Sequence, residues 1–202
     1  MNSCITCKEA IEHCMSTHTF AFAHLYGDEK IMDMHIHNCC EVYYSISGGK
    51  QFLIDHCLYD IRPGDLFLIN QFESHHLTQI DQQTHERIIL SIDPEYLSKL
   101  STGATDLGHC FSFRDTRMPH QIHLSPKEQN RFMYFIHELH DDGGMGEDLL
   151  DQAIFLELMV FLNRAFAARC TDAAAPAPAP SSNYHARWTP FYPTSTPISA
   201  SR

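Results

Sequence analysis

The chain has few cationic side chains. Lysine and arginine together number 14 against 25 aspartates and glutamates, so the formal net charge at pH 7 is −11 with neutral histidine. A chain this acidic repels the phosphate backbone of nucleic acids. We therefore expect no direct binding of nucleic acid by this chain alone.

Long apolar runs and a secretory signal are also lacking. The best apolar run, residues 153–162, is interrupted by Glu157 and is too short to cross a membrane. The first nine residues contain neither the basic stretch nor the apolar stretch of an export signal. These absences predict a cytoplasmic protein without membrane contact, in which the eight cysteines are reduced thiols.

Residues 1–18 contain Cys4, Cys7 and Cys14, with His13 beside the last of them. Such residues can bind zinc, but their spacing is not that of a standard zinc finger. The favoured interpretation is a frayed N-terminal segment with a short helix.

Residues 19–93 have the pattern of short β-strands. Apolar and aromatic runs lie at 42–46, 51–54, 66–69 and 87–90, and turn residues separate them at 47–50, 62–65 and 80–83. Many short strands with tight turns are typical of a sandwich or barrel. Asp93 and Pro94 then have the pattern of a helix start.

Two helices are predicted at 125–140 and 147–169. Ser125 and Glu128 form a capping box at the start of the first. The second helix is apolar on two faces, one of which (150, 154, 158, 161 and 165) is expected to pack on its own domain. The other face is expected to form a dimer interface. Its residues are Leu149, Ala153, Leu156 and Val160.

The composition changes after Arg169. Residues 173–180 are an alanine–proline tract, and serine, threonine and proline dominate the remainder. Such a composition is typical of a flexible segment. We predict a disordered tail over 170–202.

The clearest chemical motif is His35, His37 and Glu41, followed by Gly48. The first three are at odd-numbered positions, so on one continuous strand they would face the same side. Two imidazoles and a carboxylate together are suitable ligands for a divalent metal ion. Tyr43 has the same parity and is a candidate for contact with a ligand, although a tyrosine packed in the barrel is the more common case.

These residues give the sequence a resemblance to two nested families. The spacing of His35, His37, Glu41 and Gly48 is similar to the first cupin motif. The second cupin motif, PxGxxH, is matched by residues 71–76, which places His76 at its histidine. Within cupins, the stretches 34–49, 59–70 and 73–76 resemble the N-terminal domains of AraC-family transcription regulators.

The resemblance implies a mainly β fold with C-terminal helices: a cupin-like (jelly-roll) barrel over 19–124 followed by an antiparallel helical pair over 125–169. It also implies a small-molecule effector in the barrel and dimerisation through the helices. We predict that the lumen is lined by His35, His37, Glu41, Tyr43 and His76. The four of these other than Tyr43 are the candidate ligands of a divalent metal such as Zn, Ni or Mn. The alternative for these four residues is a polar lumen without a metal. His85 is interpreted as a surface or ordinary polar position.

The family's helix-turn-helix DNA-binding region has no counterpart after Arg169. The favoured function is therefore a ligand-sensing and dimerising module, not an enzyme, which forms a homodimer or a mixed dimer with a full-length regulator. One alternative is a small cupin metalloenzyme of the dioxygenase or isomerase type. Another is an interaction domain that blocks full-length regulators by forming mixed dimers.

Overall fold

The computed structural model describes residues 6–27, 34–49, 51–79, 85–112, 120–139 and 144–173. Eight strands and five helices are formed by these residues. In chain order they are α1 (Cys7–Thr17), β1 (Phe20–Gly27), β2 (Cys40–Ser45), β3 (Gln51–Ile54), β4 (Cys57–Asp60), β5 (Asp65–Ile69), β6 (His75–Gln79), β7 (His85–Ile92), α2 (Pro94–Leu100), α3 (His109–Ser112), β8 (Gln121–His123), α4 (Pro126–Glu138) and α5 (Glu147–Ala173).

The strands form two antiparallel sheets. The larger has the order β1-β7-β2-β5-β8 and the smaller has the order β4-β3-β6. At one end, a β-bridge between His35 and His75 attaches the segment before β2 to the smaller sheet. The predicted mainly β, cupin-like fold with C-terminal helices is confirmed.

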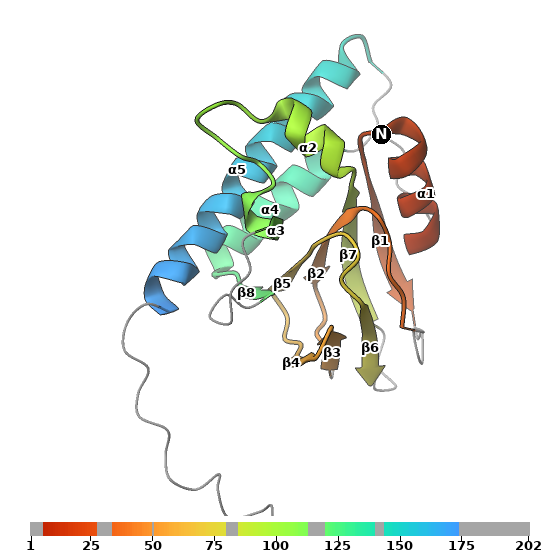
Figure 1. The fold of residues 1–202 in the computed structure, drawn as a ribbon, viewed down its shortest axis with the longest axis vertical. Helices are drawn as coiled ribbons and strands as arrows, with labels where there is room; N and C mark the ends of the chain where they lie inside the picture. Colours follow the sequence, from red (N-terminus) through yellow and green to blue (C-terminus); the bar gives the residue numbers. More distant parts are fainter. Residues whose placement is uncertain are drawn as a thin grey trace, which may run out of the picture.

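Both faces of the larger sheet are buried, which explains the nearly continuous apolar character of its strands. Phe20 and Phe22 of β1 face the helices, whereas Ala21 and Ala23 face the interior between the sheets and α1. In Figure 1, α4 and α5 lie side by side along one side of the sheet and α1 lies beside β1. The two apolar layers position the ends of the strands, where the polar residues lie.

The helix starts follow their capping residues. Asp93 accepts a hydrogen bond from the Glu95 amide at the start of α2, and Ser125 and Glu128 form the predicted capping box at α4. α4 and α5 run antiparallel, with Glu128 next to Arg169 and Phe135 next to Phe161. α5 extends to Ala173, four residues beyond the predicted end.

Residues 6–17 are an integral part of the fold, so the expectation of a frayed segment is wrong for them. α1 has a capping box formed by Thr6 and Glu9, and it buries Ala10 and Cys14 against the interior cluster. The predicted tail from residue 174 onward lies outside the described residues. Among the described helices, none combines the length and the apolar character that a membrane span needs.

Candidate functional site

The main polar site lies where the segment before β2 meets the start of β6. His35 and His75 are directly opposite each other, and each backbone amide donates to the other's carbonyl, at 3.2 and 3.1 Å. His37 and Glu41 complete the group. We call His35, His37, His75 and Glu41 the histidine cluster.

The ligand atoms of this cluster converge. One ring nitrogen from each of the three histidines lies within 4.8 Å of the other two. The Glu41 carboxylate is 3.1 Å from Nε2 of His37 and 3.8 Å from Nε2 of His75. Within the described part of the chain, no other group of three or more such side chains is close enough to hold one ion.

A hydrogen bond to the backbone fixes the tautomer of His75 in which Nε2 can bind a metal ion. Its Nδ1 lies 2.9 Å from the Glu73 carbonyl, which can only accept, so Nδ1 carries the proton. Nε2 then has a lone pair directed into the cluster. This nitrogen is buried and has no hydrogen-bond partner among the described residues. An unpartnered buried nitrogen is costly, and a metal ion would satisfy it.

The ring of His37 is also oriented by a hydrogen bond from its Nδ1 to a backbone carbonyl. Its Nδ1 donates to the Cys39 carbonyl at 2.9 Å, and its Nε2 faces Glu41. A lone pair on Nε2 would repel the carboxylate, so either a proton or a cation must lie between these two atoms. A divalent ion can take the place of that proton.

Charge in the cluster is mutually stabilised. Burial alone would lower the pKa of His37, but its hydrogen bonds with the thiol of Cys39 and the carboxylate of Glu41 raise that pKa to about 10. Burial alone would raise the pKa of Glu41, but the hydrogen bond from His37 and the charges of the neighbouring histidines lower it below its ordinary value. Burial lowers the pKa of His75, which favours its neutral, metal-binding form.

The expectation that His76 joins the cluster is wrong, because His75 takes that place. Successive side chains of a strand face opposite sides, and His76 pairs with Leu53 on β3 with its side chain turned away from the cluster. Aligning the second cupin motif one residue earlier, at 70–75, would have identified His75. Phe72 then stands at the motif's glycine, and its φ of 64° is the left-handed conformation that glycine adopts easily.

The prediction that His35, His37 and Glu41 lie on one continuous strand is also wrong. β2 begins at Cys40, and residues 38–39 form a bend. His35 instead belongs to the bridge with His75. The three side chains converge because the bend returns the chain toward the bridge.

Tyr43 lies deeper in the interior and is almost fully buried. Its hydroxyl is hydrogen-bonded to Nε2 of His85, whose Nδ1 contacts the Gly48 carbonyl. His85 is therefore a buried structural residue and not an ordinary polar position. The ring of Tyr43 packs against Phe52 and Phe67, so aromatic rings occupy the space between the sheets.

The cysteines do not assemble the N-terminal zinc set within the described residues. Cys7 and Cys14 lie on α1, and Cys14 is buried against the interior, while Cys4 is outside the described residues. Cys39 lies against the histidine cluster, with its Sγ 3.3 Å from Nδ1 of His37. A hydrogen bond with Cys14, opposed by burial and reinforced by His37, lowers the pKa of Cys39 to about 6.

The candidate dimer face lies on α5. Leu149 is 67% exposed and Ala153 is exposed, whereas Leu156 and Val160 are half-buried against the core. Leu150, expected on the inward face, is 66% exposed because α5 begins beyond the edge of the core.

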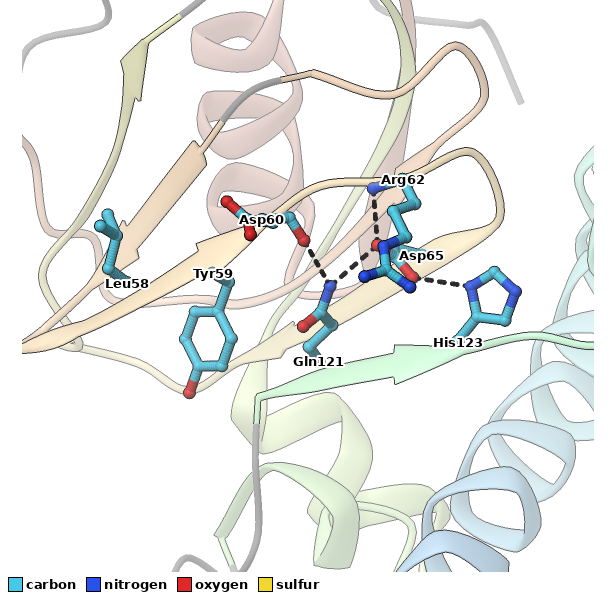
Figure 2. Close-up of a pocket in the computed structure, with 7 residues that line it drawn as sticks. All are labelled: Leu58, Tyr59, Asp60, Arg62, Asp65, Gln121 and His123. Atoms are coloured by element: carbon cyan, nitrogen blue, oxygen red, sulfur yellow. Dashed lines mark hydrogen bonds and ion pairs between the residues drawn. The ribbon is translucent and has the colours of Figure 1, made fainter. Parts of the chain in front are cut away.

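A second polar site is a cavity of about 380 Å³ lined by residues of β4, β5 and β8 and of the turn before β5. We call it the β4–β8 pocket, and Figure 2 shows the seven residues that line it. They are Leu58, Tyr59, Asp60, Arg62, Asp65, Gln121 and His123. Sequence reasoning did not find this pocket, because residues 62–65 have the pattern of an ordinary turn and β8 is only three residues long.

The model of the AraC-like ligand binding domain matches residues 19–159, well over half of the chain. The chain belongs to this family. A comparison with curated proteins gave no match.

Several solved structures are similar over smaller regions. A chain of oxalate decarboxylase OxdC from Bacillus subtilis is 21% identical, with 37% of this chain and 21% of that chain covered and a TM-score of 0.34. An RmlC-like cupin from Shewanella frigidimarina is 17% identical, with 37% and 67% covered and a TM-score of 0.34. DMSP lyase DddQ from Ruegeria pomeroyi is 21% identical, with 37% and 38% covered and a TM-score of 0.33. This chain matches about a fifth of the length of the decarboxylase chain.

Proposed function

We propose that this chain is the ligand-sensing and dimerisation module of an AraC-type transcription regulator, and that a divalent metal ion binds in its histidine cluster. The membership of the AraC-like ligand binding domain family supports the sensing role. The observation that carries the metal proposal is the buried, unpartnered Nε2 of His75, which faces the Glu41 carboxylate.

The donor set suits a first-row ion. Three imidazoles and one carboxylate are ligands that Zn, Ni and Mn accept. When bound, such an ion supplies a fixed positive charge and an open coordination position. The chain's own contribution is orientation, because the backbone carbonyls of Cys39 and Glu73 fix the rings of His37 and His75.

The interior next to the cluster favours an ion over a larger ligand at this place. The ring of Phe52 lies 6.0 Å from that of His75 between centroids, and it packs in turn on Tyr43 and Phe67. An organic substrate would have to displace these buried rings. This packing supports a sensing role more than the alternative of a cupin metalloenzyme.

Titration of metal-free protein tests this proposal. Zn, Ni or Mn added in a calorimeter is expected to bind at one ion per chain. At pH 7.5 it should release about one proton, the one held by His37. The proton count follows from repeating the titration in buffers of different ionisation enthalpy. Substoichiometric binding, or binding with no proton released, would contradict the proposal.

The dimer is proposed to form through the exposed end of α5. Leu149 is 67% exposed and Ala153 is exposed, and the partly buried Leu156 and Val160 lie on the following turns of the same helix face. A twofold pair of such surfaces buries them on both copies. The same surface could pair with that of a full-length regulator, which gives a mixed dimer.

Light scattering of two variants tests the dimer. Leu149→Glu is expected to give monomers, whereas Leu58→Glu, at a 55% exposed leucine on the barrel, should remain dimeric. A charge at Leu158 would be uninformative, because that residue is fully buried in the core. An unmodified protein that is monomeric at tens of micromolar, an order-of-magnitude concentration for a modest interface, would refute the proposal.

A further inference from the structure

The β4–β8 pocket has a polar wall whose side chains are held in place. Asp65 is 1% exposed, and its carboxylate accepts from three donors: the Arg62 amide, Nε2 of Gln121 and Nδ1 of His123, at 2.6 to 2.8 Å. The same Gln121 nitrogen donates to the Asp60 carbonyl, at 2.7 Å, and so joins the two sheets. The charge of Asp65 is therefore satisfied internally and orients its neighbours.

Three groups of this wall remain available to a ligand. Among the described residues, the Arg62 guanidinium has no hydrogen-bond or ion-pair partner, and neither does Oε1 of Gln121. Because Nδ1 of His123 donates to Asp65, its Nε2 is an acceptor in the neutral ring. Figure 2 shows Arg62, Gln121 and His123 around Asp65.

The remaining walls are formed by Leu58, Tyr59 and Asp60. Leu58 is 55% exposed and Tyr59 is half-buried. The carboxylate of Asp60 accepts from Gln51 on the neighbouring strand, and in Figure 2 it points away from the guanidinium of Arg62. Arg62 therefore faces the cavity as a cation with a planar fork of donors, which suits a carboxylate.

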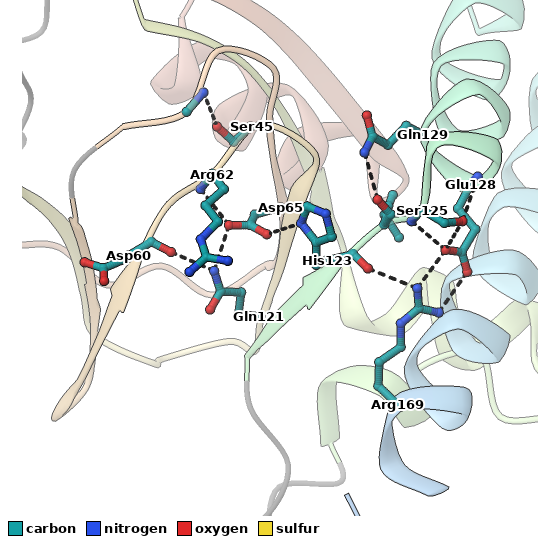
Figure 3. Close-up of polar contacts among 12 residues, drawn as sticks. Ser45, Asp60, Arg62, Asp65, Gln121, His123, Ser125, Glu128, Gln129 and Arg169 are labelled. Carbon is teal, nitrogen blue, oxygen red and sulfur yellow. Dashed lines mark hydrogen bonds and ion pairs between the residues drawn. The ribbon is translucent and has the colours of Figure 1, made fainter. Parts of the chain in front are cut away.

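The pocket is rigidly connected to the helices. Arg169 of α5 donates to the His123 carbonyl at 3.0 Å and binds both carboxylate oxygens of Glu128 at 2.8 and 2.7 Å, as Figure 3 shows. Gln129 of α4 donates to the Leu124 carbonyl at 2.7 Å. Gln121 and His123 are therefore preformed for a ligand, whereas the Arg62 side chain, which has no partner among the described residues, becomes ordered when a ligand binds.

We propose that the β4–β8 pocket is the binding site for a small organic effector, a carboxylic acid that carries hydroxyl groups. Arg62 binds the carboxylate, Oε1 of Gln121 and Nε2 of His123 accept from hydroxyls, and Leu58 and Tyr59 contact the carbon chain. The volume of about 380 Å³ is in the range of small-molecule sites. This assignment rests on the proposed sensing role, and it places the organic ligand outside the aromatic-filled interior.

Calorimetry with matched probes tests the site. Gluconate and its dicarboxylic analogue glucarate are the acids, and glucitol, which has the hydroxyls without a carboxylate, is the control compound. We expect at least one acid to bind the unmodified protein with a Kd of about 1 mM or below, and glucitol to bind at least about tenfold more weakly. Saturable binding by neither acid, or equal binding by glucitol, would overturn the proposal.

Variants assign the binding to the pocket. Arg62→Gln should weaken binding of the acid at least about tenfold, because it removes one charge-assisted contact. Arg164→Gln, at an exposed arginine that lines a different hollow, should leave it unchanged. His75→Ala should also leave it unchanged, so a failed metal proposal and a failed pocket proposal give different results. Binding that Arg62→Gln does not alter would overturn the assignment.

Discussion

The histidine cluster and the β4–β8 pocket satisfy their charges in opposite ways. In the cluster, Glu41 is paired with His37 in a buried space, and the two stabilise each other's charge. In the pocket, the buried Asp65 accepts only from an amide, a carboxamide and an imidazole, while the cation Arg62 faces a cavity. The first arrangement leaves room for an ion, and the second leaves a charge available to a molecule.

The largest effect is expected at Glu41. In metal-free protein, Glu41→Ala leaves the His37 cation buried without its partner, so the free energy of unfolding should fall by about 3–5 kcal/mol. Urea unfolding at pH 7 measures this loss. Glu157→Ala, which removes a half-exposed partner of Arg131, should cost no more than about 1 kcal/mol. A Glu41 variant as stable as this control would contradict the account of the cluster.

Asp65→Ala should have the next largest effect, about 2–3 kcal/mol. It leaves three donors without an acceptor, but none of them is a permanent cation, and the pocket lets water reach them. The control is Asp60→Ala, whose exposed carboxylate accepts one long bond of 3.4 Å from Gln51 and whose loss should be within about 0.5 kcal/mol. If Asp65→Ala cost more than Glu41→Ala, the contrast between the two regions would be wrong.

Glu128, in the link between the pocket and the helices, should show an intermediate effect that depends on pH. The hydrogen bond from Arg169 lowers its pKa to about 2, below its ordinary 4.5. The contribution of Glu128 to the free energy of unfolding is therefore present above pH 4.5 and is lost as the pH falls toward 2. Glu128→Gln should cost about 1–2 kcal/mol at pH 7 and less at pH 3. A difference from the unmodified protein that stays constant between these two pH values would exclude this pairing.

Arg62→Gln is expected to have the smallest effect on stability. Its guanidinium has no partner among the described residues, so the change should be within about 0.5 kcal/mol even though ligand binding is weakened. Thermal unfolding without ligand measures it. A clear loss of stability would mean that Arg62 supports the fold, and its role as a free recognition group would fail.

Much of the fold could be predicted from local signals. The strands β3 and β5 and the helix starts at Pro94 and Pro126 follow from short-range turn and capping chemistry. β8 was not found, because a three-residue edge strand is defined by its pairing with β5 and not by its own sequence. The end of α5 was placed early, because residues 170–173 give no stop signal other than composition.

The candidate site could be predicted only in part. The spacing of His35, His37 and Glu41 identified the first half of the histidine cluster. The second half depends on which of two adjacent histidines faces inward, and a shift of one residue reverses that choice. Phe72, in the turn before β6, has a left-handed φ of 64°. The β4–β8 pocket depends on contacts between residues about 60 positions apart, such as those of Gln121 with Asp60 and Asp65, and no local pattern indicates them.

Metal analysis of two adjacent variants tests the central claim most directly. Protein purified without an affinity tag is analysed by inductively coupled plasma mass spectrometry, for the unmodified chain, His75→Ala and His76→Ala. The account predicts about one divalent ion per chain in the unmodified protein and in His76→Ala, and a near-complete loss in His75→Ala, because only His75 directs a nitrogen into the cluster. Equal metal content in the two variants, or loss in His76→Ala alone, would contradict it.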